Sequence, residues 1–178
     1  MRVGVVSDTH IPSRAPAIPP IVFEVFEGID LILHAGDVSV RAALDELAAL
    51  APVHAVAGNV DDASLQAGLP AQLRLDLDGV TVGMVHDSGA STGRRERMRR
   101  RFPGCRVVVY GHSHLPVVED REGLMLLNPG SACDPRGAKV PTVAILEIAG
   151  GEVSAHLVSL EAPGGRPGAG RAPTPSGL

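Results

Sequence analysis

Two residues with metal-binding side chains, Asp8 and His10, follow an apolar run at residues 3–6. The length and β-branched content of this run predict a buried strand, and α/β proteins place their chemistry where such strands end. In an extended backbone, residues i and i+2 point the same way, so the carboxylate and the imidazole can be directed at one point. A divalent ion such as Mn²⁺, Zn²⁺ or Fe²⁺ suits such a pair. Taken alone, the pair is better explained as a strand end followed by a turn.

Four more apolar runs of strand length end in residues that can bind metal ions. Several of these ends contain a glycine, which lets the backbone turn tightly beside a crowded site. The additional candidate ligands are Asp37, Asn59, His86, His112 and His114. The last two repeat the i, i+2 spacing of the first pair. Together the seven side chains exceed the needs of one four- or five-coordinate ion, and they fit two ions that share a bridging carboxylate.

Individual candidate ligands also have structural explanations. Asp37 could cap a helix, Asn59 could hold a left-handed turn, and His86 could be an ordinary strand-end histidine. The occurrence of all seven candidates at strand ends favours a metal site over a set of independent structural roles.

The composition is that of an ordinary globular protein. The chain has 178 residues, of which 44% are hydrophobic, 20% are charged and 2% are aromatic, so Val, Leu, Ile and Ala must form the core. The net charge of −4 gives no general attraction to nucleic acids or anionic membranes. The two cysteines make no disulfide framework, and we expect neither a signal peptide nor a membrane span. A cytoplasmic protein without stable nucleic-acid binding is expected.

The order of predicted elements indicates two mixed sheets. In the first part of the chain, strands are predicted at 3–6, 29–34 and 53–57, with helices at 18–26 and 39–50, the second capped by Ser39. Hairpin-rich sequence follows, with strands predicted at 72–77, 80–85, 107–110, 117–119, 124–127, 142–148 and 152–160, and a basic helix at 92–102. Two sheets packed face to face with helices outside would bury these apolar faces in one domain, residues 1–161. Residues 162–178, dense in Pro and Gly, are expected to form a flexible tail.

The motifs that carry the candidate ligands also occur in a familiar order. SDTH at 7–10, AGD at 35–37, GNVD at 58–61, VHDSG at 85–89 and GHSH at 111–114 resemble the calcineurin-like metallophosphoesterase superfamily. The small size and the NPGS segment at 128–131 are most similar to its small prokaryotic phosphodiesterase branch. The resemblance covers nearly all of the chain except the tail. It implies an α/β fold, a four-layer αββα sandwich of two mixed β-sheets flanked by helices, in agreement with the layers predicted above.

The same resemblance assigns the ligands to two ions. It implies a first metal held by Asp8, His10, Asp37 and His114, and a second held by Asp37, Asn59, His86 and His112, with Asp37 as the bridge. The residues alone indicate the number of ligands and not their assignment. We expect two divalent cations, with Mn²⁺ favoured and Ni²⁺, Co²⁺, Zn²⁺ or Fe²⁺ as alternatives.

The implied activity is hydrolysis of small phosphodiesters by in-line attack of a hydroxide that bridges the two cations. Many superfamily members have a histidine directly after the metal-binding asparagine, where it can protonate the leaving group, but this chain has Val60. Asp61, which supports that histidine in such members, is then left to shape the turn. We therefore predict a preference for activated aryl diesters over alkyl phosphates.

Two alternative functions are a phosphomonoesterase and a non-catalytic protein-interaction scaffold, the latter because a eukaryotic retromer subunit is similar in fold. A scaffold can lose a histidine ligand without penalty, so the presence of all seven matched ligands favours the enzyme.

Three residues are candidates for contacts with a substrate phosphate. Asn59 adjoins the predicted site, Ser131 belongs to the NPGS segment, and Arg136 could steer or clamp a phosphodiester. A plain turn explains the NPGS segment equally well, and a surface position explains Arg136 at least as well.

Other features are expected to be structural. The six arginines between residues 94 and 101 are expected to form a solvated helix face. His34 is expected to pack beneath Asp37, and nothing marks Cys133 as a nucleophile. The two C-terminal strands offer an edge at which copies of the chain could pair into a homo-oligomer.

Overall fold

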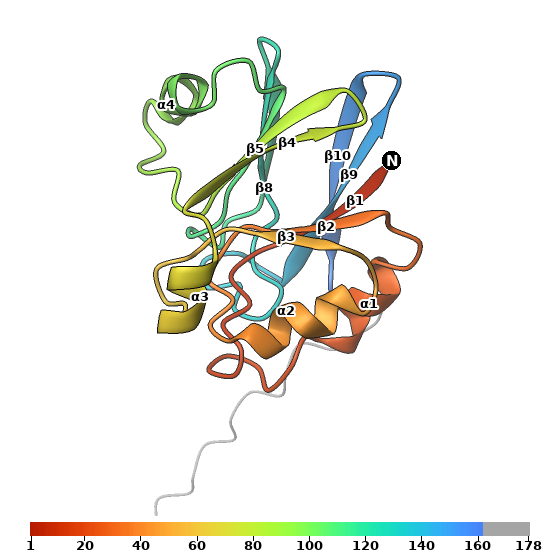
Figure 1. Cartoon of the computed structure of the whole chain (residues 1–178), viewed down its shortest axis with the longest axis vertical. Helices are drawn as coiled ribbons and strands as arrows, with labels where there is room; N and C mark the ends of the chain where they lie inside the picture. The colour runs from red at the N-terminus through yellow and green to blue at the C-terminus, as the bar shows by residue number, and fades with distance from the viewer. Residues whose placement is uncertain (162–178) are drawn as a thin grey trace, which may run out of the picture.

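The computed structural model describes residues 1–161 of the chain. Two five-stranded mixed sheets pack face to face, with strand orders β10-β9-β1-β2-β3 and β4-β5-β6-β8-β7 (Figure 1). The predicted tail, residues 162–178, lies outside the described residues. No helix within residues 1–161 is long and apolar enough to cross a membrane.

The first sheet is built mainly from the first part of the chain. Its strands are β1 (Arg2–Val6), β2 (Leu31–His34), β3 (Val53–Ala55), β9 (Thr142–Ala149) and β10 (Glu152–Ser159). β1, β2 and β3 run parallel, and parallel neighbours need a crossover, which helices provide here. Figure 1 shows that the helices α1 (Pro20–Val25), α2 (Arg41–Ala48) and α3 (Ala63–Gly68) lie on the outer side of this sheet.

The second sheet comes from the middle of the chain. Its strands are β4 (Gln72–Leu77), β5 (Val80–Val85), β6 (Val107–Val109), β7 (Val117–Arg121) and β8 (Leu124–Asn128). The helix α4 (Arg94–Arg101) lies on its outer side (Figure 1). The four layers and all ten predicted strands confirm the αββα sandwich.

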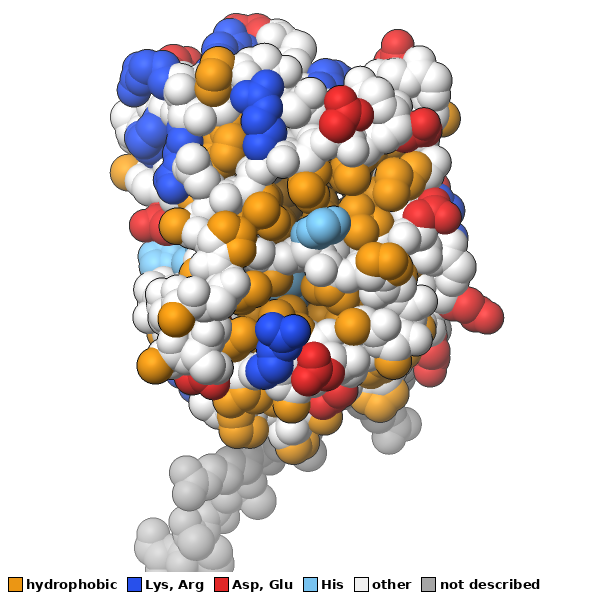
Figure 2. Space-filling model, in the orientation of Figure 1, with side chains coloured by type: hydrophobic (Ala, Val, Ile, Leu, Met, Phe, Trp, Pro, Cys, Tyr) orange, Lys and Arg blue, Asp and Glu red, His pale blue; other side chains and the backbone are white. Residues whose placement is uncertain are grey.

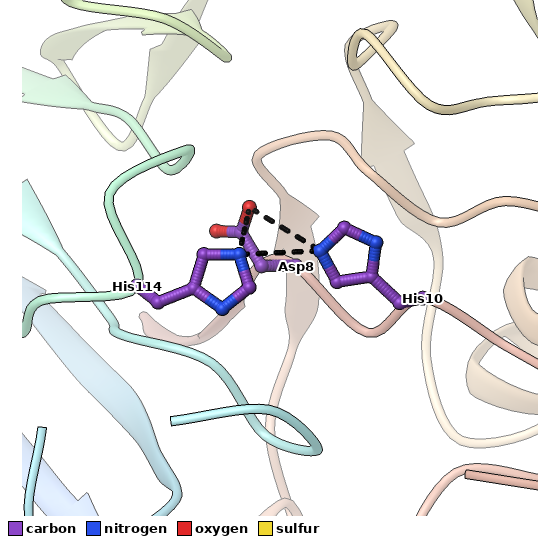
Figure 3. Close-up of side chains that lie close together, drawn as sticks. All are labelled: Asp8, His10 and His114. Carbon is purple, nitrogen blue, oxygen red and sulfur yellow. Dashed lines mark hydrogen bonds and ion pairs between the residues drawn. The ribbon is translucent and has the colours of Figure 1, made fainter. Parts of the chain in front are cut away.

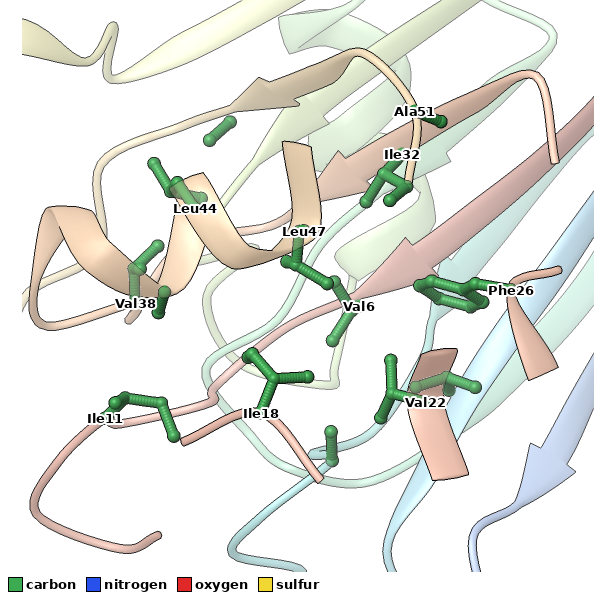
Figure 4. Close-up of a cluster of buried hydrophobic side chains, with 14 of the residues drawn as sticks. Val6, Ile11, Ile18, Val22, Phe26, Ile32, Val38, Leu44, Leu47 and Ala51 are labelled. Carbon is green, nitrogen blue, oxygen red and sulfur yellow. The ribbon is translucent and has the colours of Figure 1, made fainter. Parts of the chain in front are cut away.

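Alternate residues of the strands build two separate parts of the core. Val5 and Leu33 of the first sheet meet Val107 and the other inward side chains of the second sheet. Their chain neighbours, such as Val6 and Ile32, point the other way and pack under α1 and α2 (Figure 4). This two-residue alternation explains why β1 and β2 read as continuous apolar runs, because both faces of these strands are covered.

Two local features differ from the predictions. Ser39 does not cap α2, because the helix starts at Arg41 after Val40 with no side-chain cap. Instead Ser39 has a left-handed φ of 79°, and its backbone N–H donates to Asp61 Oδ1 at 2.7 Å. The helix α3 was not predicted, since its six residues are too few for an apolar period, although Asp62 caps it by accepting from the Leu65 N–H.

The arginines of α4 are also less solvated than expected. Figure 2 shows basic side chains gathered over this helix. However, Arg94 stacks on Tyr110, Arg95 donates to three backbone carbonyls of the β7–β8 hairpin, and Arg97 donates to the carbonyls of Ser88 and Ala90. The prediction of a solvated face is therefore wrong for these three arginines, which fasten α4 to Tyr110, to the β7–β8 hairpin and to the loop before the helix.

Candidate metal centre

The candidate ligands gather where strands of both sheets end. β1, β2 and β3 run parallel in one sheet and β5 and β6 in the other, so the polar ends of each set lie at one edge. The structure brings together all seven side chains, which are Asp8, His10, Asp37, Asn59, His86, His112 and His114.

The backbone that presents these side chains is left-handed rather than extended. Asp8, His10, Asp37, His112 and His114 have φ values of 55°, 50°, 56°, 67° and 57°. The extended i, i+2 geometry assumed from the sequence is therefore wrong. Asp8 and His10 still converge, whereas His112 and His114 point to different groups of ligands. A left-handed conformation costs a residue with a Cβ about 1–2 kcal/mol, so the surrounding contacts must hold these turns in place.

Three of the ligands form a buried group, here called the inner cluster: Asp8, His10 and His114 (Figure 3). His114 Nε2 lies 3.2 Å from His10 Nε2 and 3.4 Å from Asp8 Oδ1. His10 Nε2 lies 4.0 Å from the same carboxylate oxygen. The two imidazole rings stack with their centroids 5.1 Å apart. Three potential ligand atoms from chain segments about 100 residues apart thus face one point.

Three other ligands form the outer cluster: Asp37, His86 and His112. His86 Nε2 lies 3.2 Å from Asp37 Oδ2 and 3.3 Å from His112 Nδ1. Asn59 Oδ1 joins them, at 2.9 Å from His112 Nδ1 and 3.1 Å from His86 Nε2. Asp37 and His86 are buried, whereas His112 is exposed, so this cluster opens to solvent.

Asp37 lies between the two clusters. Its Oδ2 is 3.2 Å from His86 Nε2 and 3.8 Å from His10 Nε2 of the inner cluster. Its Oδ1 accepts a hydrogen bond from the Val60 N–H at 3.0 Å, which fixes the orientation of the carboxylate. This position is compatible with the predicted bridging role of Asp37, which remains a prediction.

The hydrogen bonds behind the histidines show whether the site suits cations. His86 Nδ1 donates to the Ala35 carbonyl at 2.8 Å, and its Nε2 faces two oxygen acceptors, Asp37 Oδ2 and Asn59 Oδ1. Burial acts to lower the pKa of His86, but the hydrogen bond with Asp37 and the charges of nearby carboxylates outweigh it and raise that pKa, so without a cation Nε2 carries a proton. His114 Nδ1 likewise donates to the Asp134 carbonyl, and its Nε2 faces inward. Lone pairs that face one another are repulsive unless a proton or a cation lies between them. The donor set therefore fits divalent cations, in the manner of metal-binding histidines held by a backbone carbonyl.

The charges of the two carboxylates differ because their surroundings differ. Burial raises the pKa of Asp8 to about 7, although the charge of His86 and the Ser7 hydroxyl act against this rise. Burial also acts to raise the pKa of Asp37, but the hydrogen bond with and charge of His86 outweigh it and hold that pKa at about 2. Asp8 thus lacks a sufficient positive partner within the protein, and a bound cation would supply one.

The NPGS segment has a structural role, which corrects the prediction for Ser131. The Ser131 hydroxyl donates to the Asp8 carbonyl at 2.7 Å and accepts from the Asp134 N–H at 2.8 Å. The residue is only 1% exposed, so its hydroxyl cannot reach a substrate. Asn128 is fully buried and donates to the Gly111 carbonyl at 2.9 Å. The segment holds the turns of Asp8 and His112 together and does not present groups to a phosphate.

Arg136 is exposed beside the inner cluster together with a residue that was not predicted, Arg14. Their Nε atoms lie 3.1 Å and 3.3 Å from the same oxygen, Asp134 Oδ2. Burial lowers the pKa of His10. The charge of Asp37 acts against this, and the charges of Arg136 and Arg14 act with it. Two guanidinium groups that share one carboxylate leave net positive charge there. Arg14 carries no local signal in the sequence, because its partner is far along the chain.

The neighbouring polar residues behave largely as expected. Asp61 accepts the backbone N–H groups of Ser39 and Gly58, both at 2.7 Å, and so shapes the turn. His34 is fully buried between Thr9 and the Gly36 N–H, and burial lowers its pKa to about 3, so it is a neutral packing residue.

Cys133 is not suited to nucleophilic attack. Burial, with the charge of Asp134 as a smaller cause, raises the pKa of its thiol to about 12. The reactive form of a cysteine is the thiolate, so this side chain is inert near neutral pH.

A pocket of about 480 Å³ opens beside the outer cluster. Asn59, His86 and His112 belong to its lining. The rest of its lining includes the small apolar side chains Ala57, Ala71 and Val85 and the polar side chains Gln66, Asp87 and Arg101. No sequence motif indicated this pocket, because its walls come from loops and elements that are distant in the chain.

An αββα sandwich with adjoining His and Asp clusters at its strand ends is the architecture of a metal-dependent phosphoesterase. The family profile described as "Calcineurin-like phosphoesterase superfamily domain" matches residues 1–151, and the chain belongs to this superfamily. Membership of this family and the names of the relatives support a hydrolase of phosphate esters.

The chain is similar to curated proteins over nearly its whole length. It is 38% identical over 165 residues to a "Probable metallophosphoesterase" of Methanothermobacter thermautotrophicus, covering 92% of this chain and 95% of that protein. It is 26% identical over 163 residues to a phosphodiesterase of Methanocaldococcus jannaschii, covering 83% and 93%. Among solved structures, wild-type Vps29 of Entamoeba histolytica complexed with zinc has a TM-score of 0.71 at 26% identity, covering 90% of this chain and all of that one.

Proposed function

We propose that this protein is a dimetal phosphodiesterase that acts on small phosphodiesters and favours activated aryl diesters. The observation that carries the proposal is the position of Asp37, whose carboxylate lies within 4 Å of a histidine of each cluster. A family whose relatives include a named phosphodiesterase supports the same reaction class. We propose Mn²⁺ as the metal, and the mixed set of imidazole, carboxylate and amide ligands is compatible with it as with several other first-row ions.

Each group of residues has a distinct part in this reaction. Two divalent cations, when bound, would supply the charge that activates a water molecule and neutralises the phosphoryl oxygens. The inner cluster would hold one ion and the outer cluster, with Asn59, the other, while the Val60 N–H orients Asp37. Arg14 and Arg136 add positive charge at the rim, which favours the approach of an anionic diester.

The leaving group has no acid to protonate it at the position after Asn59. Val60 is 47% exposed, and its side chain has no proton to donate. The adjacent Asp61 accepts two backbone N–H groups and is held in its turn. A leaving group must therefore depart as a stable anion, so nitrophenolate esters should react much faster than alkyl esters. Equal turnover of p-nitrophenyl and simple alkyl diesters would contradict this specificity.

The proposal is tested by hydrolysis of bis-p-nitrophenyl phosphate by the metal-depleted protein after addition of Mn²⁺, Ni²⁺, Co²⁺ or Zn²⁺. We expect activity with Mn²⁺, and its loss in Asp37→Ala and His112→Ala. The matched control is His156→Ala, which removes an exposed histidine of β10 and should leave activity unchanged. No activity with any of the four metals would favour the non-catalytic scaffold. Faster turnover of p-nitrophenyl phosphate than of the diester would make the protein a phosphomonoesterase.

We also infer a reducing, cytoplasmic setting. Both cysteines, Cys105 and Cys133, are free thiols, which supports this setting.

A further inference from the structure

We infer that Arg101 selects substrates that carry a second anionic group, a carboxylate or a further phosphate, on an ester arm. This inference rests on the proposed phosphodiesterase function and adds the substrate class. It starts from the pocket beside the outer cluster, which shares Asn59, His86 and His112 with the candidate metal centre. A phosphate bound between the clusters therefore has this pocket as a neighbouring space for one of its organic arms.

The size of the pocket suits an arm as large as a substituted phenyl ring or a sugar. Its volume is about 480 Å³, within the range of about 300–1,000 Å³ that small-molecule sites occupy. Ala57, Ala71 and Val85 are short side chains that leave this space open. The arm would thus have both small apolar walls and charged side chains of the pocket around it.

Arg101 is the one arginine or lysine among the described residues that line this pocket. Its Nε donates to Gln72 Oε1 at 2.8 Å, and its Nη1 lies 3.5 Å from the Asp87 carbonyl. The guanidinium also lies over the Phe102 ring, 5.9 Å from its centroid. Neutral partners therefore orient the guanidinium without neutralising its charge.

Three other arginines in this region have a carboxylate partner, whereas Arg94, Arg97 and Arg100 have none among residues 1–161. Arg101 is therefore distinguished by its place in the pocket. Arg95 pairs with Glu119, Arg99 with Glu122, and Arg106 with Asp120, each at 3.3 Å or less. Within residues 1–161, no carboxylate oxygen lies within 4.0 Å of Arg101, so its capacity for an ion pair is unused.

Asp87 is the pocket's anionic side chain, and its orientation leaves Arg101 available. The Asp87 Oδ1 accepts the Gly89 N–H at 2.6 Å, so this carboxylate is bonded to its own loop. A carboxylate or phosphate on the substrate can form the bidentate contact with Arg101 that Asp87 does not make.

The test compares two inhibitors of bis-p-nitrophenyl phosphate hydrolysis by the Mn²⁺-loaded full chain, phenyl phosphate and 4-carboxyphenyl phosphate. They share the phosphate and the ring and differ in one carboxylate. We expect the carboxylate to lower the inhibition constant roughly 10-fold, the effect of one charge-assisted hydrogen bond. In Arg101→Gln the ratio of the two inhibition constants should fall to about 1. Arg101→Lys should restore part of this ratio, because Lys keeps the positive charge but cannot form the bidentate contact of a guanidinium.

The matched control is Arg100→Gln, which removes an exposed guanidinium from the same helix and should preserve both activity and ratio. The thermal unfolding midpoint of each variant reports whether it is folded. An unchanged ratio in folded Arg101→Gln, or equal inhibition by both compounds in the wild-type protein, would overturn the inference while the phosphodiesterase stands. If bis-p-nitrophenyl phosphate is not hydrolysed with any metal, the proposed function fails and this inference fails with it.

Discussion

The inner and outer clusters both contain His and Asp but differ in how far they open to solvent. Asp8 and His114 of the inner cluster are fully buried, whereas His112 of the outer cluster is exposed and lines the pocket. The difference arises because Ser131 ties the Asp8 turn beneath the NPGS segment, while Asn59 and His112 lie on loops at the open side. Charges attract more strongly where water is excluded. We therefore expect the inner cluster to retain a cation, and the outer cluster to exchange one and to meet the substrate.

The largest expected effect comes from the residue that joins the clusters. Asp37→Asn keeps an oxygen for the Val60 N–H but removes the negative charge that faces both His10 and His86. We expect bis-p-nitrophenyl phosphate hydrolysis to fall by more than about 100-fold and the affinity for both cations to fall. Steady-state kinetics and calorimetric Mn²⁺ titration measure these effects. The control is Asp45→Asn on the exposed face of α2, and retention of both cations by Asp37→Asn would exclude a bridge.

The expected difference in cation affinity between the two clusters is tested by removing one histidine from each. His114→Ala should weaken the tighter Mn²⁺ site, and His112→Ala the weaker one, each by about 10- to 100-fold. Calorimetric titration of the metal-depleted protein distinguishes the two sites by their affinity. The reverse assignment, with the exposed His112 supporting the tighter site, would contradict the difference inferred from burial.

His34 is expected to make a pH-dependent contribution to the free energy of unfolding. Its hydrogen bond with Thr9 supports the turn between Asp8 and His10. Burial lowers the pKa of His34 from 6.5 to about 3 in the folded protein, so the folded state requires the neutral ring. The stabilisation is complete above pH 6.5 and is lost progressively as the pH falls towards 3, because only the unfolded chain binds the proton. Between pH 7.5 and 5.5 the free energy of unfolding should fall by about 1.4 kcal/mol from this cause.

Urea unfolding of the metal-depleted protein at these two pH values measures that term. His34→Gln should unfold with a pH dependence smaller than that of the wild-type protein by about this amount, because the remaining titrating groups are common to both. Identical pH dependence in the two proteins would show that His34 carries no such term.

The smallest effect is expected at the rim of the inner cluster. Arg14→Gln or Arg136→Gln should each lower kcat/KM for an anionic diester by about 2- to 5-fold at low salt, since exposed charges contribute about 0.2–1 kcal/mol. The loss should diminish as salt is added, because exposed charges are screened. Lys139→Gln, in the same exposed segment, is the control. A larger loss that does not depend on salt would instead indicate direct contact with the phosphate.

Much of the fold and of the ligand set could be predicted because both depend on short-range patterns. A run such as 3–6 is apolar because a strand buried on both faces requires it, and the polar residues after it must lie at the sheet edge. The order of these runs was sufficient for two mixed sheets with helices outside. Asp8 and His10 were found in this way, although their backbone is left-handed and not extended.

What the sequence by itself determined is therefore the chemistry: which side chains can bind cations, and that Val60 supplies no acid. Only the tertiary structure decided which of them are buried, that Ser131 binds the Asp8 carbonyl, and that Arg101 lines a pocket without a carboxylate partner. The physical reason is that ligand type and strand pattern are local properties of the chain. Burial, pKa and unpaired charge depend on residues that are far apart in sequence, and these come together only when the two sheets pack.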